Sequence, residues 1–390
     1  MIFLNKIIFF LYNLFKKDHV TFFSGVITNK KVDLFLNSSS RFKDVPISIP
    51  DDIKNISQFY FLKHTSSNLR ILIHLPSLEH SPGGYSIFLN IYETLSFMGI
   101  NVNLLNWDDN FDIIFNQYQP NIFITSDEVN YLSRINWKLI KEYKEHKKLK
   151  VGLTASLEEY GNSPLNDRIK WAKDNLIDFY YSFRAKEYTD QRKEYDAFRE
   201  NGFNICNIEF GANLLKFYPV NELDQKQFDY IFFGSTNYSK QKRYFDYFLP
   251  ILKSSYNGMI WGPGWPWAKT EILLENQKLY YSKSKIALNL HLQEQIDWPC
   301  ELNERTYILA ACKVPQLLDN PALIKYRFSE DSYFSATNPK EYIHLMNYMI
   351  QNVEEVKWRT DKMYDEVINK HTTFHRMENF ISFLNKLSDK

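Results

Sequence analysis

The sequence predicts an α/β protein with two domains, each built around a parallel β-sheet. Short apolar runs alternate with helical stretches from about Leu69 onward, which is the order expected of parallel sheets. Residues 281–320 hold a complete unit of this kind: a strand at 286–291, a polar loop, a helix at about 303–312 and a strand at 314–318. The chain has 390 residues, which is too long for one ordinary core and suggests two.

The composition argues against a nucleic-acid-binding protein and against a protein held together by disulfides or a cysteine-bound metal. The formal net charge is +1, so the basic excess of a nucleic-acid-binding protein is missing. The three cysteines, Cys206, Cys300 and Cys312, have neither metal nor disulfide spacing. This spacing fits a protein of the reducing cytoplasm.

The first 17 residues form an apolar segment that is too short to span a bilayer. No small-residue cleavage site follows, which argues against a signal peptide. At 100° per residue its Asn and Lys side chains share one arc of roughly 120°. Two interpretations remain: a helix lying in a membrane interface, or a helix packed on its own domain. Residues 18–66 read as an edge hairpin or as an extension of the first domain.

The first domain opens with a buried strand at residues 68–76, a glycine loop and a helix from about Ser86 to Met98. Gly83 and Gly84 lie in that loop, and the next strand covers 101–107. This order is Rossmann-like, but the spacing is not GxGxxG, so no dinucleotide is implied. Further strands are expected at 121–127, 150–156 and 177–183. The basic stretch 138–148 reads as a solvated helix face.

A second domain begins after Pro219, where the strand–loop–helix order restarts. The strand at 228–233 leads into a loop with Gly234, Ser235 and Thr236, followed by the cations Lys242 and Arg243. MIWGPGW (259–265) reads as the next strand and a glycine turn. Trp261 there suits either a nucleobase or the core.

The helix at 303–312 begins with four polar residues, Asn303, Glu304, Arg305 and Thr306. In parallel sheets ligands bind outside the carboxyl ends of the strands, against helix N-termini. Arg305 and the helix amides suit a phosphate, and Glu304 suits a sugar hydroxyl. The alternative is a core helix between two core strands.

The segment NERTYILAACKVPQLL resembles the nucleotide-binding segment of GT-B glycosyltransferases, above all the CgeB-type group. FGAN…FYPV (210–220) and HTTFHR (371–376) resemble further segments of the same family, in the same order. The resemblance implies two Rossmann-like domains facing across a cleft, at 67–218 and 219–365. It also implies an N-terminal extension (1–66) and a final helix (366–390) that crosses back to the first domain.

The resemblance implies a hexosyltransferase-type enzyme (EC 2.4) that moves a sugar from a nucleotide-sugar donor to a glycan or lipid-linked acceptor. Bacterial surface polysaccharide synthesis in the cytoplasm, at the inner face of the membrane, is the expected setting. The resemblance also implies a retaining mechanism and no cofactor. The chain lacks Asp-x-Asp, which argues against a metal-chelating enzyme and suits a metal-independent one. The alternative is a non-catalytic protein of this fold that binds a sugar nucleotide or a glycan.

Site residues follow from these patterns. Acid–base roles are assigned to His80, beside the glycine pair, to Asp127, at a strand end, and to Glu304. His74, His291 and the pair His371 and His375 read as structural. The expected donor-binding residues are Gly83, Gly84, Gly234, Ser235, Thr236, Lys242, Arg243, Trp261, Gly262, Glu301, Asn303, Arg305 and Thr306.

Two positions depart from the family pattern. Ile308 stands where relatives commonly place a ribose-binding Glu, and Lys313 replaces the usual Gly. Glu301 and Glu304 are close enough in sequence to substitute for the missing carboxylate. The departure at Ile308 is what motivates the non-catalytic alternative.

Overall fold

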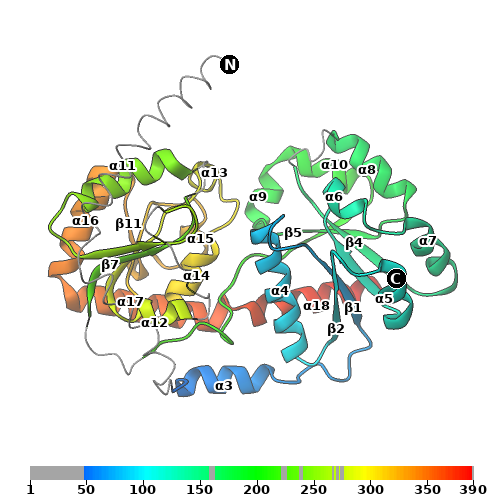
Figure 1. Cartoon of the computed structure of the whole chain (residues 1–390), viewed down its shortest axis with the longest axis horizontal. Helices are drawn as coiled ribbons and strands as arrows, with labels where there is room; N and C mark the ends of the chain where they lie inside the picture. The colour runs from blue at the N-terminus through cyan, green and yellow to red at the C-terminus, as the bar shows by residue number, and fades with distance from the viewer. Residues whose placement is uncertain are drawn as a thin grey trace, which may run out of the picture. The chain divides into compact units, whose positions relative to one another are not determined.

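A computed structural model describes residues 48–157, 163–220, 226–236, 240–265, 268, 272 and 276–388 (Figure 1). The predicted amphipathic helix at 1–17 lies outside the described residues. The chain divides into two compact units. The first-sheet unit comprises Asp51–Leu215, Trp298–Tyr307 and the residues from Val367 onward, and the second-sheet unit comprises Lys216–Asp297 and Ile308–Glu366.

The first-sheet unit holds a six-stranded parallel sheet in the order β2-β1-β3-β4-β5-β6. Every position of β3 and β5 is buried, because helices flank the sheet (Figure 1) and both faces become core. The strands are β1 (Arg70–Leu75), β2 (Asn101–Asn106), β3 (Ile122–Thr125), β4 (Lys150–Thr154), β5 (Phe179–Ser182) and β6 (Asn204–Asn207).

The helices of this unit follow the predicted alternation. The basic stretch forms α7, on which Lys138 is exposed and Ile140 is buried. The helices are α3 (Asp51–Tyr60), α4 (Pro82–Phe97), α5 (Phe111–Tyr118), α6 (Val129–Leu132), α7 (Trp137–His146), α8 (Leu165–Asp174), α9 (Lys186–Gln191), α10 (Asp196–Glu200) and α18 (Thr373–Ser388). The predicted C-terminal helix is confirmed as α18, which packs against α4.

Helix α4 begins four residues earlier than the sequence suggested. Ser81 is its N-cap and accepts a hydrogen bond from the Gly84 amide at 3.3 Å, while Pro82 occupies the first turn. Ser followed by Pro is a helix start signal, which we read as part of the glycine loop. Gly83 and Gly84 therefore lie in the first turn of a helix, and the prediction that placed them in a loop is wrong.

The second-sheet unit holds a five-stranded parallel sheet in the order β11-β10-β9-β7-β8. Its strands are β7 (Phe228–Phe233), β8 (Gly258–Trp261), β9 (Ser284–Leu288), β10 (Gln316–Leu318) and β11 (Phe334–Ser335). Its helices are α11 (Gln241–Leu252), α12 (Gln277–Tyr281), α13 (Gln293–Asp297), α15 (Ile324–Arg327) and α16 (Pro339–Gln351). Two parallel sheets flanked by helices confirm the predicted α/β class.

Two helices carry the chain from one unit to the other. The division falls after Tyr307 within α14 (Glu304–Ala311) and after Glu366 within α17 (Val353–Lys370). Between β9 and α14 the sequence predicted only a loop, and the structure places α13 there. Strand β9 also ends at Leu288, three residues before the predicted end, so His291 lies beyond the strand.

Candidate functional site

The loops that follow β7 and β8 are joined to each other at the carboxyl edge of the second sheet. The Gly234 amide donates to the Trp261 carbonyl at 2.9 Å, and the indole Nε1 of Trp265 donates to the Gly234 carbonyl at 2.7 Å. Gly262 has a φ of +139°, and a Cβ there would lie 2.5 Å from the Gly234 oxygen. Gly262 is therefore required by the close approach of the two loops.

A charged cluster occupies the same edge. We call Arg243, His291 and Asp319 the edge cluster. Arg243 Nη2 donates to Asp319 Oδ2 at 2.7 Å, and its Nη1 donates to Gln293 Oε1 at 2.8 Å. His291 Nδ1 lies 2.7 Å from Asp319 Oδ1, and the His291 amide donates to Asp319 Oδ2 at 2.8 Å. Every carboxylate oxygen of Asp319 is thus bound, and the arginine is held in one orientation.

The electrostatics of the edge cluster keep Asp319 ionised. Burial alone would raise the pKa of Asp319, but His291 and Arg243 lower it below the usual value. The Arg243 side chain is 13% exposed, and its Nε is buried without a hydrogen-bond partner among the described residues. The cluster therefore holds a fixed cation at the place where a parallel sheet binds ligands.

The other expected donor residues of this unit lie in different surroundings. Lys242 has a 90% exposed side chain and pairs with Asp246 at 3.0 Å. Trp261 is buried in the hydrophobic core, where it packs as the sequence allowed. Ser235 is exposed and Thr236 is partly buried, with its amide bound to the Pro263 carbonyl at 3.0 Å. For all of these, the donor-binding role stays a prediction.

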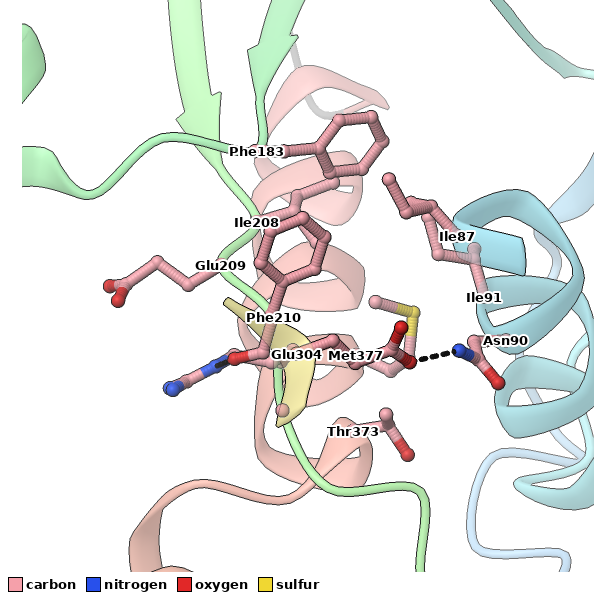
Figure 2. Close-up of a pocket in the computed structure, with 12 residues that line it drawn as sticks. Ile87, Asn90, Ile91, Phe183, Ile208, Glu209, Phe210, Glu304, Thr373 and Met377 are labelled. Atoms are coloured by element: carbon pink, nitrogen blue, oxygen red, sulfur yellow. Dashed lines mark hydrogen bonds between the residues drawn. The ribbon is translucent and has the colours of Figure 1, made fainter. Parts of the chain in front are cut away.

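Glu304 lies in a small pocket of the first-sheet unit, of about 30 Å³. Figure 2 shows its carboxylate facing Asn90 of α4, whose Nδ2 donates to Glu304 Oε1 at 2.8 Å. Asn213 Nδ2 in turn donates to Asn90 Oδ1 at 3.0 Å. Phe183 and Phe210 line the pocket with stacked rings. The space suits about one water molecule beside an oriented carboxylate.

The start of α14 is occupied by its own capping contacts. Asn303 Oδ1 accepts from the Thr306 amide at 3.0 Å and from the Thr306 hydroxyl at 3.1 Å, which is the N-cap arrangement. Glu301 is buried and forms an ion pair with Arg184. Arg305 is partly buried. The structure thus gives Asn303 and Thr306 a capping role, while donor binding by these residues remains a prediction.

The two other acid–base candidates differ in exposure. His80 Nε2 lies 3.1 Å from Glu128 Oε1, and its ring packs on Trp107 with centroids 4.3 Å apart. Asp127 is 3% exposed, accepts from Thr154 Oγ1 at 2.6 Å and pairs with Arg168. Burial raises the pKa of Asp127 to about 6, against the opposing effect of Arg168. His80 is therefore the more accessible of the two groups.

Sequence reasoning missed Glu128, Gln293 and Asp319. Asp319 directly follows the apolar run of β10, and this is the same signal that singled out Asp127 after β3. Glu128 is adjacent to Asp127, but its pairing with His80 spans 48 residues. No local pattern reveals a contact of that length.

The two departures from the family pattern have clear structural settings. Ile308 is 5% exposed and belongs to the core of the second-sheet unit. Lys313 has a φ of +55°. The Val314 amide donates to the Leu309 carbonyl and the Lys313 amide to the Ala310 carbonyl, both at 3.0 Å. This is a Schellman motif, whose left-handed position favours glycine.

The histidine pair of the C-terminal segment is bound by protein groups. His375 Nδ1 lies 2.7 Å from Thr372 Oγ1, and His371 Nδ1 lies 3.1 Å from Arg376 Nη2. In the described part of the chain, no group of three or more His, Cys, Asp or Glu side chains is placed to hold a metal ion. The same residues contain no helix long and apolar enough to cross a membrane.

Comparison with protein families gives one match. Residues 246–382, about a third of the chain, match the family described as Glycosyl transferase-like. This range includes Asp319, His291, Ile308 and the whole of α14. A comparison with curated protein sequences gives no match.

Solved structures give broader similarity. The T4 phage β-glucosyltransferase bound to UDP-glucose has a TM-score of 0.55 and 16% identity, covering 82% of this chain and 99% of its own. An α-glucosyltransferase bound to UDP-glucose and DNA has a TM-score of 0.58 and 14% identity over 82% and 99%. A glycosyltransferase of Rickettsia africae has a TM-score of 0.57 and 12% identity over the same shares. The fold is that of the GT-B enzymes, and the family match together with this fold supports a glycosyltransferase.

Proposed function

We propose that this protein transfers a sugar from a nucleotide-sugar donor to a glycan or lipid-linked acceptor. The observation that carries the proposal is the edge cluster, in which a buried Asp319 fixes Arg243 at the carboxyl edge of a parallel sheet. Two findings support the assignment. The family match extends over Asp319 and His291, and the similar T4 phage enzyme was solved with UDP-glucose.

The physical problem in such a transfer is the charge on the departing diphosphate. Arg243 lies in the first turn of α11, where the helix dipole also favours an anion. Asp319 and Gln293 hold its guanidinium before any ligand arrives, so little reorganisation is needed as negative charge develops. In a retaining, metal-independent reaction the leaving phosphate oxygen itself takes the acceptor proton, and no protein base is then required.

Ile308 favours a second candidate, a non-catalytic protein of the same fold that binds a sugar nucleotide or a glycan. The isoleucine is buried in the core of the second-sheet unit, so this position supplies no carboxylate for a ribose. Donor hydrolysis separates the two candidates, because only the transferase cleaves the sugar–phosphate bond.

A thermal-shift panel with UDP, GDP, CMP, dTDP and their sugars tests the proposal. A ligand specific for the folded state stabilises it by roughly 2.7 kcal/mol at about 100 times its dissociation constant. We expect one nucleotide to respond, and Arg243→Met to weaken its binding roughly tenfold or more, because a charge-assisted hydrogen bond contributes about 1.5–3 kcal/mol. Lys357→Met, which removes an exposed cation of the same unit, is the matched control.

Two results would count against the proposal. If a folded sample responds to no nucleotide, the protein has no donor site. If the Arg243→Met and Lys357→Met variants bind a nucleotide equally well, Arg243 is not part of the donor site. Pelleting with liposomes, before and after deletion of residues 1–17, tests the further proposal that the protein works at the inner face of a membrane.

A further inference from the structure

The first-sheet unit contains a second, larger cavity, which is lined in part by the acid–base candidate Asp127. Its volume is about 400 Å³, within the range of small-molecule sites. It lies where β3 and β4 end, and its walls include Asp127, Leu132, Trp137, Arg168 and Trp171. We call it the tryptophan cavity. It shares no lining residue with the Glu304 pocket.

Two indole rings form one wall of the tryptophan cavity. Trp137, the first residue of α7, and Trp171, on α8, meet edge to face with centroids 4.8 Å apart. The Trp137 Nε1 donates to the Leu132 carbonyl at 2.9 Å, which fixes its ring. Both side chains are only partly buried. Rigid aromatic surface therefore borders the cavity before any ligand binds.

A charged pair forms the polar part of the lining. Asp127 is bound by Thr154 and Arg168, and Arg168 Nη2 also donates to the Ser156 carbonyl at 3.1 Å. Asp167 is an exposed carboxylate in the same lining, together with the hydroxyl groups of Ser133 and Ser163. Acidic and hydroxyl-bearing residues thus share the lining with aromatic and aliphatic side chains and with Arg168.

This combination of groups selects among possible occupants. A hydrocarbon chain would take the exposed Asp167 carboxylate out of water without giving it a hydrogen-bond partner, which is costly. A phosphate would meet Asp127 and Asp167, while the Arg168 charge is already balanced by Asp127. A sugar ring offers an apolar face to the indoles and hydroxyl donors to the carboxylates.

We propose that the tryptophan cavity binds a neutral sugar residue of the acceptor. The assignment of this sugar as the acceptor rests on the proposed transferase function, whereas sugar binding itself does not. Asp127 is held at the cavity as an acceptor of hydrogen bonds, and Asp167 selects against acidic sugars by charge repulsion. The site therefore prefers neutral hexoses or N-acetylhexosamines to uronic acids.

Intrinsic tryptophan fluorescence measures this binding directly. The unsubstituted chain is titrated with methyl glucoside, galactose, N-acetylglucosamine and glucuronate, with octanol and UMP as the competing chemistries. We expect a saturable change with at least one neutral sugar and a weaker one with glucuronate. Trp171→Phe and Asp167→Asn should each weaken binding about three- to tenfold, as the loss of roughly 1 kcal/mol predicts. Trp358→Phe, at an exposed tryptophan of the other unit, is the control.

The outcomes separate the two proposals. No saturable binding of any neutral sugar overturns the sugar site, as does binding that neither Trp171→Phe nor Asp167→Asn changes, or binding led by octanol, UMP or glucuronate. If sugar binding depends on Trp171 but the chain binds no nucleotide, the sugar site is supported and the transferase function is contradicted. If the chain has transfer activity and its acceptor KM is the same in Trp171→Phe and Trp358→Phe, the transferase function is supported and the sugar site is contradicted.

Discussion

The carboxyl edges of the two sheets each bury an aspartate against an arginine, yet the two carboxyl groups have opposite pKa shifts. Burial raises the pKa of Asp127 in the first-sheet unit to about 6, although Arg168 and Thr154 oppose it. Burial also acts most strongly on Asp319, but His291 and Arg243 together lower its pKa. The difference is a second partner, His291, whose imidazole and backbone amide both contact the Asp319 carboxylate.

The contacts around the two carboxylates agree with this difference in pKa. Asp319 has both carboxylate oxygens bound by the other two members of the edge cluster. Asp127 borders the tryptophan cavity and has one cation beside it. A buried carboxylate that is held by an arginine and a histidine stays ionised and orients the arginine. A carboxylate with a single cation beside an open space, such as Asp127 with its pKa of about 6, can change its protonation state when that space is filled.

Removing each arginine is the strongest test of this comparison. Arg168→Leu leaves Asp127 buried without a cation, and we expect it to lower the free energy of unfolding by about 3–5 kcal/mol. Arg243→Leu should cost less, about 1–3 kcal/mol, because His291 still holds Asp319. Denaturant unfolding of both variants at neutral pH measures the difference.

The order of the two effects decides the outcome. If Arg243→Leu were the more destabilising variant, the two contacts of His291 would not be enough to stabilise the buried Asp319 carboxylate. Lys186→Leu, at a 72% exposed cation on α9, is the control for loss of a surface charge, and it should change the unfolding free energy by less than about 1 kcal/mol.

The two aspartates should also change the pH dependence of stability in opposite directions, and this effect is smaller than that of removing the arginines. The raised pKa of Asp127 contributes stability that is complete below about pH 4 and is lost as pH rises through about 6. The lowered pKa of Asp319 contributes stability that is present above pH 4 and is lost as pH falls below it. Asp127→Asn should therefore remove a decline between pH 4 and 6 of about 3 kcal/mol at most, and Asp319→Asn should remove a loss on the acid side.

Unfolding free energies at pH 3, 4, 5, 6 and 7 for the two asparagine variants and the unsubstituted chain test these slopes. A decline between pH 4 and 6 that survives in Asp127→Asn would assign the titration to another group. Acid loss that survives in Asp319→Asn would do the same for the edge cluster.

The sequence predicted the fold well because its signal is local. Buried parallel strands are continuous apolar runs, and the runs around Ile73, Ile124 and Ile231 fall within β1, β3 and β7. The errors are one misplaced helix start and one short helix that was not predicted. Ser81 and Pro82 start α4 inside a segment that its two glycines made look like a loop, and α13 is only five residues long.

The site could be predicted only where a residue type and a strand end coincide. Arg243 and Asp127 were found in that way. The partners that set their charge states come from distant segments: Asp319 is 76 residues from Arg243, and Arg168 is 41 residues from Asp127. The capping contact of Asn303 with Thr306 shows the converse, since a local hydrogen bond explains two residues that we expected to meet a ligand.

Glycines at the two edges extend the comparison to the backbone. Gly262 has a φ of +139° and no room for a Cβ, whereas Gly83 has nothing within 4 Å of the position where its Cβ would lie. Gly262→Ala should therefore destabilise the second-sheet unit by about 1–3 kcal/mol, and Gly83→Ala, in the first turn of α4, should stabilise the chain by about 0.4–1 kcal/mol. Melting temperatures that move in opposite directions would confirm that the turn after β8 is fixed by backbone packing. A neutral Gly262→Ala would mean that the loop can separate from Gly234, and a destabilising Gly83→Ala would mean that the space beside α4 is needed.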